Sequence, residues 1–255
     1  MINKKYYFFS DVHLGLKSKE EEKLKEKRVV HFLDSAKADA EKIYIVGDLF
    51  DCWIEYRKVV PKGYYRLFSK IYEVVNKNVK ITYLAGNHDF WRGRYFSDEF
   101  GITIIDRNLE RQINGKKFFI SHGDGLAYKD TGYRILKKIL RNKISQKLYS
   151  LIHPDIGIWL AKRTSATSRT HTEQKDYSQR DGLKDFAIKK IGAGFDFVIM
   201  GHRHKPLKVE NNGSYYINLG DWIDDFSYGL FKSEEFKLIK FFDLKRKEVV
   251  NEEII

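Results

Sequence analysis

Six short runs of aromatic and β-branched residues each end abruptly in a polar cluster that in most cases contains glycine. Such runs are typical of buried strands. The chain therefore has to bring several strand ends together, and this requirement limits the fold more than any other feature. The six runs are residues 6–9, 43–46, 81–84, 118–120, 195–200 and 215–217.

Helical periodicity fills the gaps between the early strands. Residues 20–40 and 64–76 have this pattern, and in the second segment the apolar residues fall on one side of the predicted helix. Alternating strands and helices predict a layered α/β architecture, in which ligand sites gather beyond the carboxyl ends of the strands. We therefore expect one site built from at least five loops.

The length and composition favour one domain in the cytoplasm. The 255 residues contain enough apolar side chains for a sizeable core, and no stretch resembles an interdomain linker. We predict a single domain over residues 1–255 that contains a helical insert at residues 125–170. One cysteine, Cys52, excludes an internal disulfide, and the absence of a signal peptide adds to the expectation of a cytoplasmic protein.

The polar clusters contain the side chains of a metal site. Imidazole, carboxylate and amide oxygen together suit Mn, Fe, Zn or Ni. Seven ligands are too many for one tetrahedral ion and fit two ions about 3.5–4 Å apart, with Asp48 as the predicted bridge. The candidate ligands are Asp11, His13, Asp48, Asn87, His122, His202 and His204.

A plainer interpretation treats each of these residues as a turn former or a satisfied polar group. Five of the eight histidines lie in the clusters, however, which a random distribution does not explain. Asp11 and Asp48 would also be costly to bury side by side without a cation. The metal interpretation is therefore favoured.

In this order, the motifs Asp-Val-His, Gly-Asp-Leu-Phe-Asp, Gly-Asn-His-Asp, His-Gly-Asp and Gly-His-Arg-His resemble the calcineurin-like metallophosphoesterase superfamily. The resemblance implies a two-sheet β-sandwich flanked by helices, within the α/β (α+β) class. It also implies two divalent ions, with Mn²⁺ expected first and Fe, Zn or Ni as alternatives. The implied ligands of one ion are Asp11, His13, Asp48 and His204, and those of the other are Asp48, Asn87, His122 and His202.

Within the superfamily, residues 47–53, 86–90, 122–133, 201–206 and 218–222 are most similar to the UDP-2,3-diacylglucosamine pyrophosphatases of lipid A biosynthesis. That resemblance implies hydrolysis of the pyrophosphate of UDP-2,3-diacylglucosamine by a metal-bridging hydroxide. The products would be UMP and 2,3-diacylglucosamine 1-phosphate.

This chain has His88 where the best-known members carry Arg. We expect His88 to act with Asp48 in catalysis, either stabilising the pentavalent phosphoryl group or protonating the leaving oxygen. The expected substrate contacts are Asp130, Tyr133, Arg163 and Ser165, the first two by local match to the family.

The predicted insert is both basic and amphipathic. Residues 125–170 contain ten Lys or Arg and two Asp, which accounts for eight of the twelve net positive charges. Its apolar residues recur at helical spacing, so it could receive an acyl chain and face anionic lipid headgroups. The plainer alternative is an ordinary helical cap with its cations in solvent. We expect a nucleotide-lipid substrate and peripheral contact with the inner face of the cytoplasmic membrane, and we infer no nucleic-acid or obligate protein partner.

Two other functions remain open. One is a phosphodiesterase or nuclease of the same superfamily that acts on a soluble nucleotide or nucleic acid, which His88 in a Gly-Asn-His-Asp motif would suit. The other is a non-catalytic scaffold. A scaffold should have lost ligands, whereas this chain retains all seven together with His88.

Overall fold

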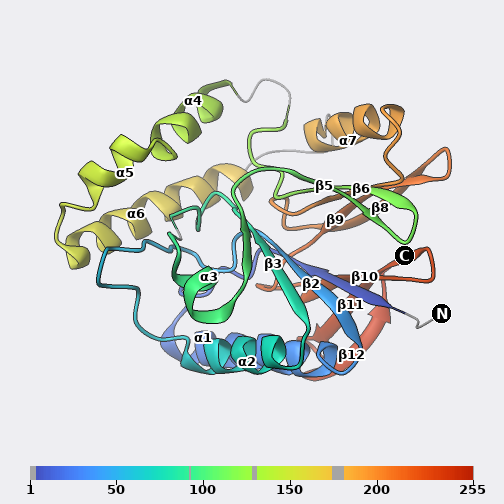
Figure 1. The fold of residues 1–255 in the computed structure, drawn as a ribbon, viewed down its shortest axis with the longest axis horizontal. Helices are drawn as coiled ribbons and strands as arrows, with labels where there is room; N and C mark the ends of the chain where they lie inside the picture. Colours follow the sequence, from blue (N-terminus) through green and yellow to red (C-terminus); the bar gives the residue numbers. More distant parts are fainter. Residues whose placement is uncertain (1–3, 92, 128–130, 174–180, 255) are drawn as a thin grey trace.

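Two β-sheets face each other in the centre of the molecule (Figure 1). The computed structural model describes residues 4–91, 93–127, 131–173 and 181–254, with the backbone alone for residues 131–133, 136 and 165–173. Within these residues, the first sheet has seven strands in the order β12-β11-β10-β1-β2-β3-β4. The second has five, in the order β5-β6-β7-β9-β8.

Three neighbouring strands in each sheet run parallel and supply the loops that carry the motifs. In the first sheet these are β1 (Lys5–Phe9), β2 (Ala40–Val46) and β3 (Lys80–Leu84). In the second they are β6 (Lys116–Ser121), β7 (Phe197–Met200) and β9 (Ser214–Leu219). All six polar clusters therefore leave the carboxyl end of a parallel strand.

The remaining strands extend the two sheets outward from these parallel centres. In the first sheet they are β4 (Thr103–Ile105), β10 (Ser227–Lys232), β11 (Glu235–Asp243) and β12 (Glu248–Glu253). In the second they are β5 (Leu109–Ile113) and β8 (Pro206–Asn211). Of these, only β4 pairs parallel to its neighbour.

Helices cover the outer face of each sheet. Helices α1 (Lys19–Ala36) and α2 (Tyr65–Asn76) lie against the first sheet, where α3 (Tyr95–Phe100) joins the same core, and α7 (Gly182–Gly192) lies against the second (Figure 1). Ser18 begins α1 with a capping box that includes Glu21.

Alternation along the strands divides the apolar residues between three layers of core. In β1, Phe8 points between the two sheets, while Tyr7 and Phe9 point toward α1. Phe8 is fully buried, and its ring lies 4.8 Å from that of Tyr44 and 5.5 Å from that of Phe236. The aromatic-rich sequence of the strands thus fills the space between the sheets.

Three helices between β6 and α7 form a separate arm, seen at the upper left of Figure 1. They are α4 (Thr131–Leu140), α5 (Lys143–Tyr149) and α6 (Pro154–Glu173). The arm contacts the sandwich through a small cluster in which Tyr149, Ile158 and Ala161 pack against the buried side chains of residues 52, 54 and 56. In the described part of the chain, no helix has both the length and the apolar character to cross a bilayer.

The two-sheet sandwich flanked by helices confirms the predicted fold class. The six predicted strands are present, although β7 begins at Phe197 and not at residue 195. The first predicted helix is shorter than expected: it ends at Ala36, because Ala40 already begins β2 and pairs with Lys5.

Replacing Phe8 by Ala should lower the free energy of unfolding by about 3–5 kcal/mol, because the change leaves a cavity between two packed sheets. Urea unfolding followed by circular dichroism measures the effect. Tyr65→Ala is the matched control, since that side chain is 61% exposed, and it should change stability by no more than about 0.5 kcal/mol. Equal unfolding midpoints for the two variants would contradict the proposed inter-sheet core.

Candidate metal centre

The predicted ligands lie in loops with an unusual backbone. Five of them have positive φ angles: 54° at Asp11, 47° at His13, 53° at Asp48, 68° at His202 and 57° at His204. Non-glycine residues seldom adopt this conformation, and where they do, the surrounding structure has to enforce it. The backbone of these loops is therefore strained, and such strain is concentrated at functional sites.

One group of side chains combines Asp11, His13 and His204. Nε2 of His13 lies 3.2 Å from Nε2 of His204, and the latter lies 3.3 Å from Oδ1 of Asp11. That carboxylate oxygen is buried and accepts no hydrogen bond from the described residues. Two ring nitrogens and an orphaned carboxylate oxygen facing one another are the arrangement expected of ligands around a cation.

A second group combines Asp48, His122 and His202, and Asn87 lies among them. Oδ1 of Asn87 lies 2.9 Å from Nε2 of His122 and 3.0 Å from Nδ1 of His202. Nδ1 of His122 donates to the carbonyl of Val46 at 3.0 Å. Because Nδ1 keeps this proton, Nε2 is the ring atom that can offer a lone pair to a metal once the ring is neutral.

Asp48 lies between the two groups. Its Oδ2 is 3.7 Å from Nε2 of His13 and 3.1 Å from Nε2 of His122. Glycine allows this close packing: a Cβ at Gly86 would lie 1.9 Å from Oδ1 of Asp48, and one at Gly47 would lie 2.5 Å from Nδ1 of His122. The structure therefore brings all seven predicted ligands together, with Asp48 in the central position.

His88 lies beside these groups and is held by Asp51. Its Nδ1 donates to the backbone carbonyl of Asp51 at 3.1 Å, while its own backbone N–H donates to Asp48 at 2.9 Å. Burial lowers the pKa of His88, which favours the neutral ring. Asp89 has a different role, because its carboxylate accepts hydrogen bonds from the backbone N–H groups of Leu49 and Gly86.

Lys25 and Glu22 of α1 hold the first ligand loop. The buried ammonium of Lys25 donates to the carbonyl of His13 at 2.6 Å and pairs with Glu22 at 2.9 Å. Glu22 in turn accepts from the backbone N–H groups of Gly15 and Lys17, both at 2.7 Å. The sequence analysis missed both residues, because they lie in a helical segment that otherwise looks like an ordinary charged surface.

Asp221 was also missed as a participant, although its motif was recognised. Its Oδ2 lies 3.7 Å from Nδ1 of His204, and its Oδ1 accepts from three successive backbone N–H groups, at residues 223–225. A carboxylate behind a ligating imidazole fixes the orientation of the ring. Its position directly after β9, as in the other five clusters, was the available signal.

The carboxylates control the protonation of the histidines. Burial alone would lower the pKa of His122, but Asp48 and Asp11 outweigh it and raise that pKa to about 10. Burial also opposes the shift at His13, where the nearby carboxylates of Asp11 and Asp51 raise the pKa to about 9. Burial, together with the nearby His122, lowers the pKa of His202 to about 4. Protons on the first two rings thus offset the carboxylate charge whenever no metal does so.

The donor set fits a divalent metal centre. It consists of imidazole nitrogens, carboxylates and an amide oxygen, with an orphaned buried oxygen on Asp11. The single cysteine, Cys52, is not in these groups, and burial raises its pKa to about 12. The chemistry of the site is therefore that of a borderline or hard cation.

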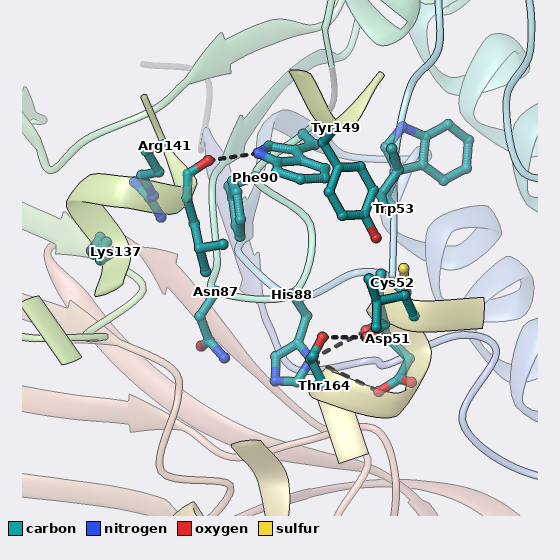
Figure 2. A pocket seen from close by; sticks show the side chains of 15 residues that line it. Asp51, Cys52, Trp53, Asn87, His88, Phe90, Lys137, Arg141, Tyr149 and Thr164 are labelled. Carbon is teal, nitrogen blue, oxygen red and sulfur yellow. Dashed lines mark hydrogen bonds and ion pairs between the residues drawn. The ribbon is translucent and has the colours of Figure 1, made fainter. Parts of the chain in front are cut away.

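An apolar cavity of about 360 Å³ opens beside Asn87 and His88 (Figure 2). One side of the cavity is lined by the loops that follow β2 and β3, including Trp53 and Phe90. The other side is lined by the helical arm. The residues that the arm contributes are Lys137, Leu140, Arg141, Tyr149, Leu160, Ala161 and Thr164.

The predicted substrate contacts are less clearly placed. Asp130 lies outside the described residues, as do the side chains of Tyr133 and Ser165, whose backbones belong to α4 and α6. Arg163 is exposed on α6, with its guanidinium 5.7 Å from the centre of the Trp159 ring. It does not line the cavity beside His88.

Comparison with known proteins identifies the relatives of this chain. The family model for calcineurin-like phosphoesterases matches residues 4–206. A UDP-2,3-diacylglucosamine hydrolase of Porphyromonas gingivalis is 32% identical, over 90% of this chain and 94% of that protein. One from Neisseria meningitidis is 31% identical, over 87% of this chain and 91% of that protein. In fold, the chain resembles vacuolar protein sorting 29 from Cryptosporidium parvum, with a TM-score of 0.50, 12% identity and coverage of 100% and 99%.

Binding of Mn²⁺ to the metal-stripped protein at pH 7 should release on the order of two protons, because His13 and His122 must deprotonate to become ligands. Calorimetry at pH 7 in buffers of different ionisation enthalpy measures the release, which should fall as the pH rises through 9 to 10. Because folding raises the pKa values of both histidines, their protonated rings stabilise the folded, metal-stripped protein fully below about pH 6.5. This stabilisation is lost as the pH rises through 9 to 10. Binding heats that do not depend on the buffer would contradict this scheme.

Proposed function

Because this chain belongs to the calcineurin-like phosphoesterase family, it is a metal-dependent phosphoester or pyrophosphate hydrolase, and we propose that its substrate is UDP-2,3-diacylglucosamine. The products would be UMP and 2,3-diacylglucosamine 1-phosphate. Relatives with this activity in their names match the chain along most of both lengths. The observation that carries the proposal is the apolar cavity that opens directly beside Asn87 and His88.

The cavity suits an acyl group attached close to a phosphate. Its volume of about 360 Å³ is within the usual range for ligand sites, and Trp53, Phe90 and Leu160 are among its apolar walls. Burying ten methylenes there would contribute about 8 kcal/mol before the cost of ordering the chain. Lys137 and Arg141 also line this cavity (Figure 2), and the carboxylate of Asp124 lies close to both of them.

We assign two ions to the candidate centre. Asp11, His13, Asp48 and His204 would hold one, and Asp48, Asn87, His122 and His202 the other. The oxygen and nitrogen donors favour Mn²⁺, with Fe, Zn or Ni as alternatives. When bound, the ions would supply an acidified water and neutralise charge on the phosphoryl oxygens. Asp48 would hold the pair together, which its position between the two groups supports.

His88 would act on the phosphoryl group without holding a metal. Nδ1 donates to the carbonyl of Asp51, and we assign Nε2 to the substrate. There it would orient the phosphoryl oxygens and exchange a proton with the reacting group. Asp51 would keep the ring in place, as its carbonyl does in the structure.

Residues 125–170 would be the unit that receives the lipid and meets the membrane. The arm exposes large apolar side chains, among them Ile139 at 55%, Leu148 at 62% and Leu151 at 79%. Lys and Arg residues alternate with them along α4 and α5. Exposed apolar groups flanked by cations suit peripheral binding to an anionic membrane surface, as the inner face of a cytoplasmic membrane provides.

Asp48→Ala should abolish hydrolysis, by more than about 1,000-fold, and should also lower metal content, because the bridge between the ions is lost. His88→Ala should lower the rate by roughly 100- to 10,000-fold while both metals stay bound. Steady-state rates and elemental analysis of the same samples measure both effects. Near-normal turnover in Asp48→Ala would refute the shared bridge, and metal loss in His88→Ala would make His88 a ligand.

Charge placed in the cavity should separate lipid from non-lipid substrates. The double variant Leu160→Glu, Ala161→Glu should reduce hydrolysis of UDP-2,3-diacylglucosamine in detergent by roughly 100-fold or more, because an acyl chain would have to desolvate the carboxylates on the cavity wall. Cleavage of bis(p-nitrophenyl) phosphate should survive within about threefold, since the metal centre is untouched.

The matched control for the cavity variant is Leu151→Glu with Ile156→Glu, on exposed positions of the arm outside the cavity. It should behave as wild type on substrate in detergent and lose binding to anionic vesicles. If the wild type instead cleaves soluble nucleotides or DNA and ignores the lipid, the phosphodiesterase alternative replaces the proposal.

A further inference from the structure

Arg141, the first residue after α4, reaches from the arm to the loops of the sandwich. Its Nη2 donates to the carbonyl of Gly86 at 2.9 Å, and its Nη1 donates to the carbonyl of Asp106 at 2.8 Å. Nη2 also lies 3.7 Å from Oδ2 of Asp124, which pairs with Lys137 of α4 at 2.6 Å. One guanidinium therefore connects three separate loops.

Two of those loops carry neighbouring candidate ligands. Gly86 directly precedes Asn87, and Asp124 follows His122 by two residues. The amide oxygen of Asn87 and Nε2 of His122 lie 2.9 Å apart. The relative position of these two side chains thus depends on how the two loops are held.

Gly86 also leaves almost no room for adjustment. A Cβ on this residue would lie 1.9 Å from Oδ1 of Asp48 and 2.5 Å from the backbone nitrogen of Asp48. A shift of Gly86 would therefore be transmitted to the candidate bridging carboxylate. The carbonyl that Arg141 holds belongs to this same residue.

We infer that Arg141 is a positioning residue through which the helical arm sets the geometry of one metal site, that of Asp48, Asn87, His122 and His202. The inference rests on the proposed division of the ligands between two ions, and it does not depend on the lipid substrate. It also separates two roles within the arm. The apolar cavity selects the substrate, while Arg141 acts on the centre itself.

Arginine suits this position because its planar head presents several donors in fixed directions. Gly86 and Asp106 occupy two of those directions at once. A lysine would keep the charge but could not hold both carbonyls with the same geometry. Nε1 of Trp91 donates to the carbonyl of Leu140 at 2.8 Å, which holds the end of α4 directly before Arg141.

The experiment titrates Mn²⁺ into metal-stripped protein and follows free Mn²⁺ by electron paramagnetic resonance. Arg141→Gln should weaken one of the two sites by about 10- to 100-fold, the range found for outer partners of metal ligands. Arg141→Lys should recover only part of that loss. Arg134→Gln is the matched control, because Arg134 is an exposed cation of α4 whose guanidinium donates to the carbonyl of Ala127 and not to that of Gly86; it should bind both ions as the wild type does.

Single-site backgrounds identify which ion is affected. His204→Ala should leave the site that contains Asn87, and adding Arg141→Gln should weaken it. Asn87→Ala should leave the other site, and adding Arg141→Gln should change its affinity by less than about twofold. With bis(p-nitrophenyl) phosphate, the Arg141→Gln variant should show a fall in kcat at nearly constant KM.

Equal weakening of both sites, or wild-type affinities with an unchanged kcat in a folded Arg141→Gln protein, would overturn the inference. If Arg141→Gln does not fold, the Mn²⁺ affinities and kcat of Arg141→Lys test the inference in the same way. The melting temperature of Arg141→Lys shows whether that variant is folded. Failure of the wild type to cleave the nucleotide-lipid would remove the proposed substrate only. The effect of Arg141 on one Mn²⁺ site would remain measurable.

Discussion

The buried carboxylates of Asp11 and Asp48 need compensating positive charge, and the rest of the structure provides for it. Both are almost completely shielded from water, and they lie at the ends of adjacent parallel strands. Two such charges are stable together only when cations or protons lie within reach. The histidines that surround them supply protons through raised pKa values, and a divalent metal provides the same compensation with more charge.

Holding these groups together requires loops that would not adopt their conformation alone. Five candidate ligands have positive φ angles, and Gly47 and Gly86 leave only the space that a hydrogen atom fills. The stability needed to enforce such loops comes from the cores on either side, where Phe8 and Phe118 lie between the sheets and Phe9 and Phe32 lie under the first. Packing of the aromatic strands thus provides the stability that holds the polar loops in their strained conformation.

The sequence was sufficient to find the parallel strands and their motifs, because each buried run is followed by a conspicuous change to polar residues. It did not identify β10, β11 or β12 as strands, since these follow the last motif and end in no such cluster. The division of the strands between two sheets came from a family resemblance, because pairing depends on contacts between distant segments. Lys25 was missed for a related reason. A lysine on a charged helix looks like an ordinary surface residue in the sequence, and only the fold shows that it is buried against His13.

The arm shows how one helix can serve two surfaces. In α4, Ile135 and Ile139 are exposed one turn apart, whereas Lys137 and, just after the helix, Arg141 turn toward the sandwich. Under the proposed membrane contact, the bilayer would act on the same helix that holds Asp124 and ends beside Arg141. Because Gly86 abuts Asp48, a displacement of α4 would be felt at the centre of the site. If the arm binds a membrane as proposed, the end of this one helix would connect that surface to the metal centre.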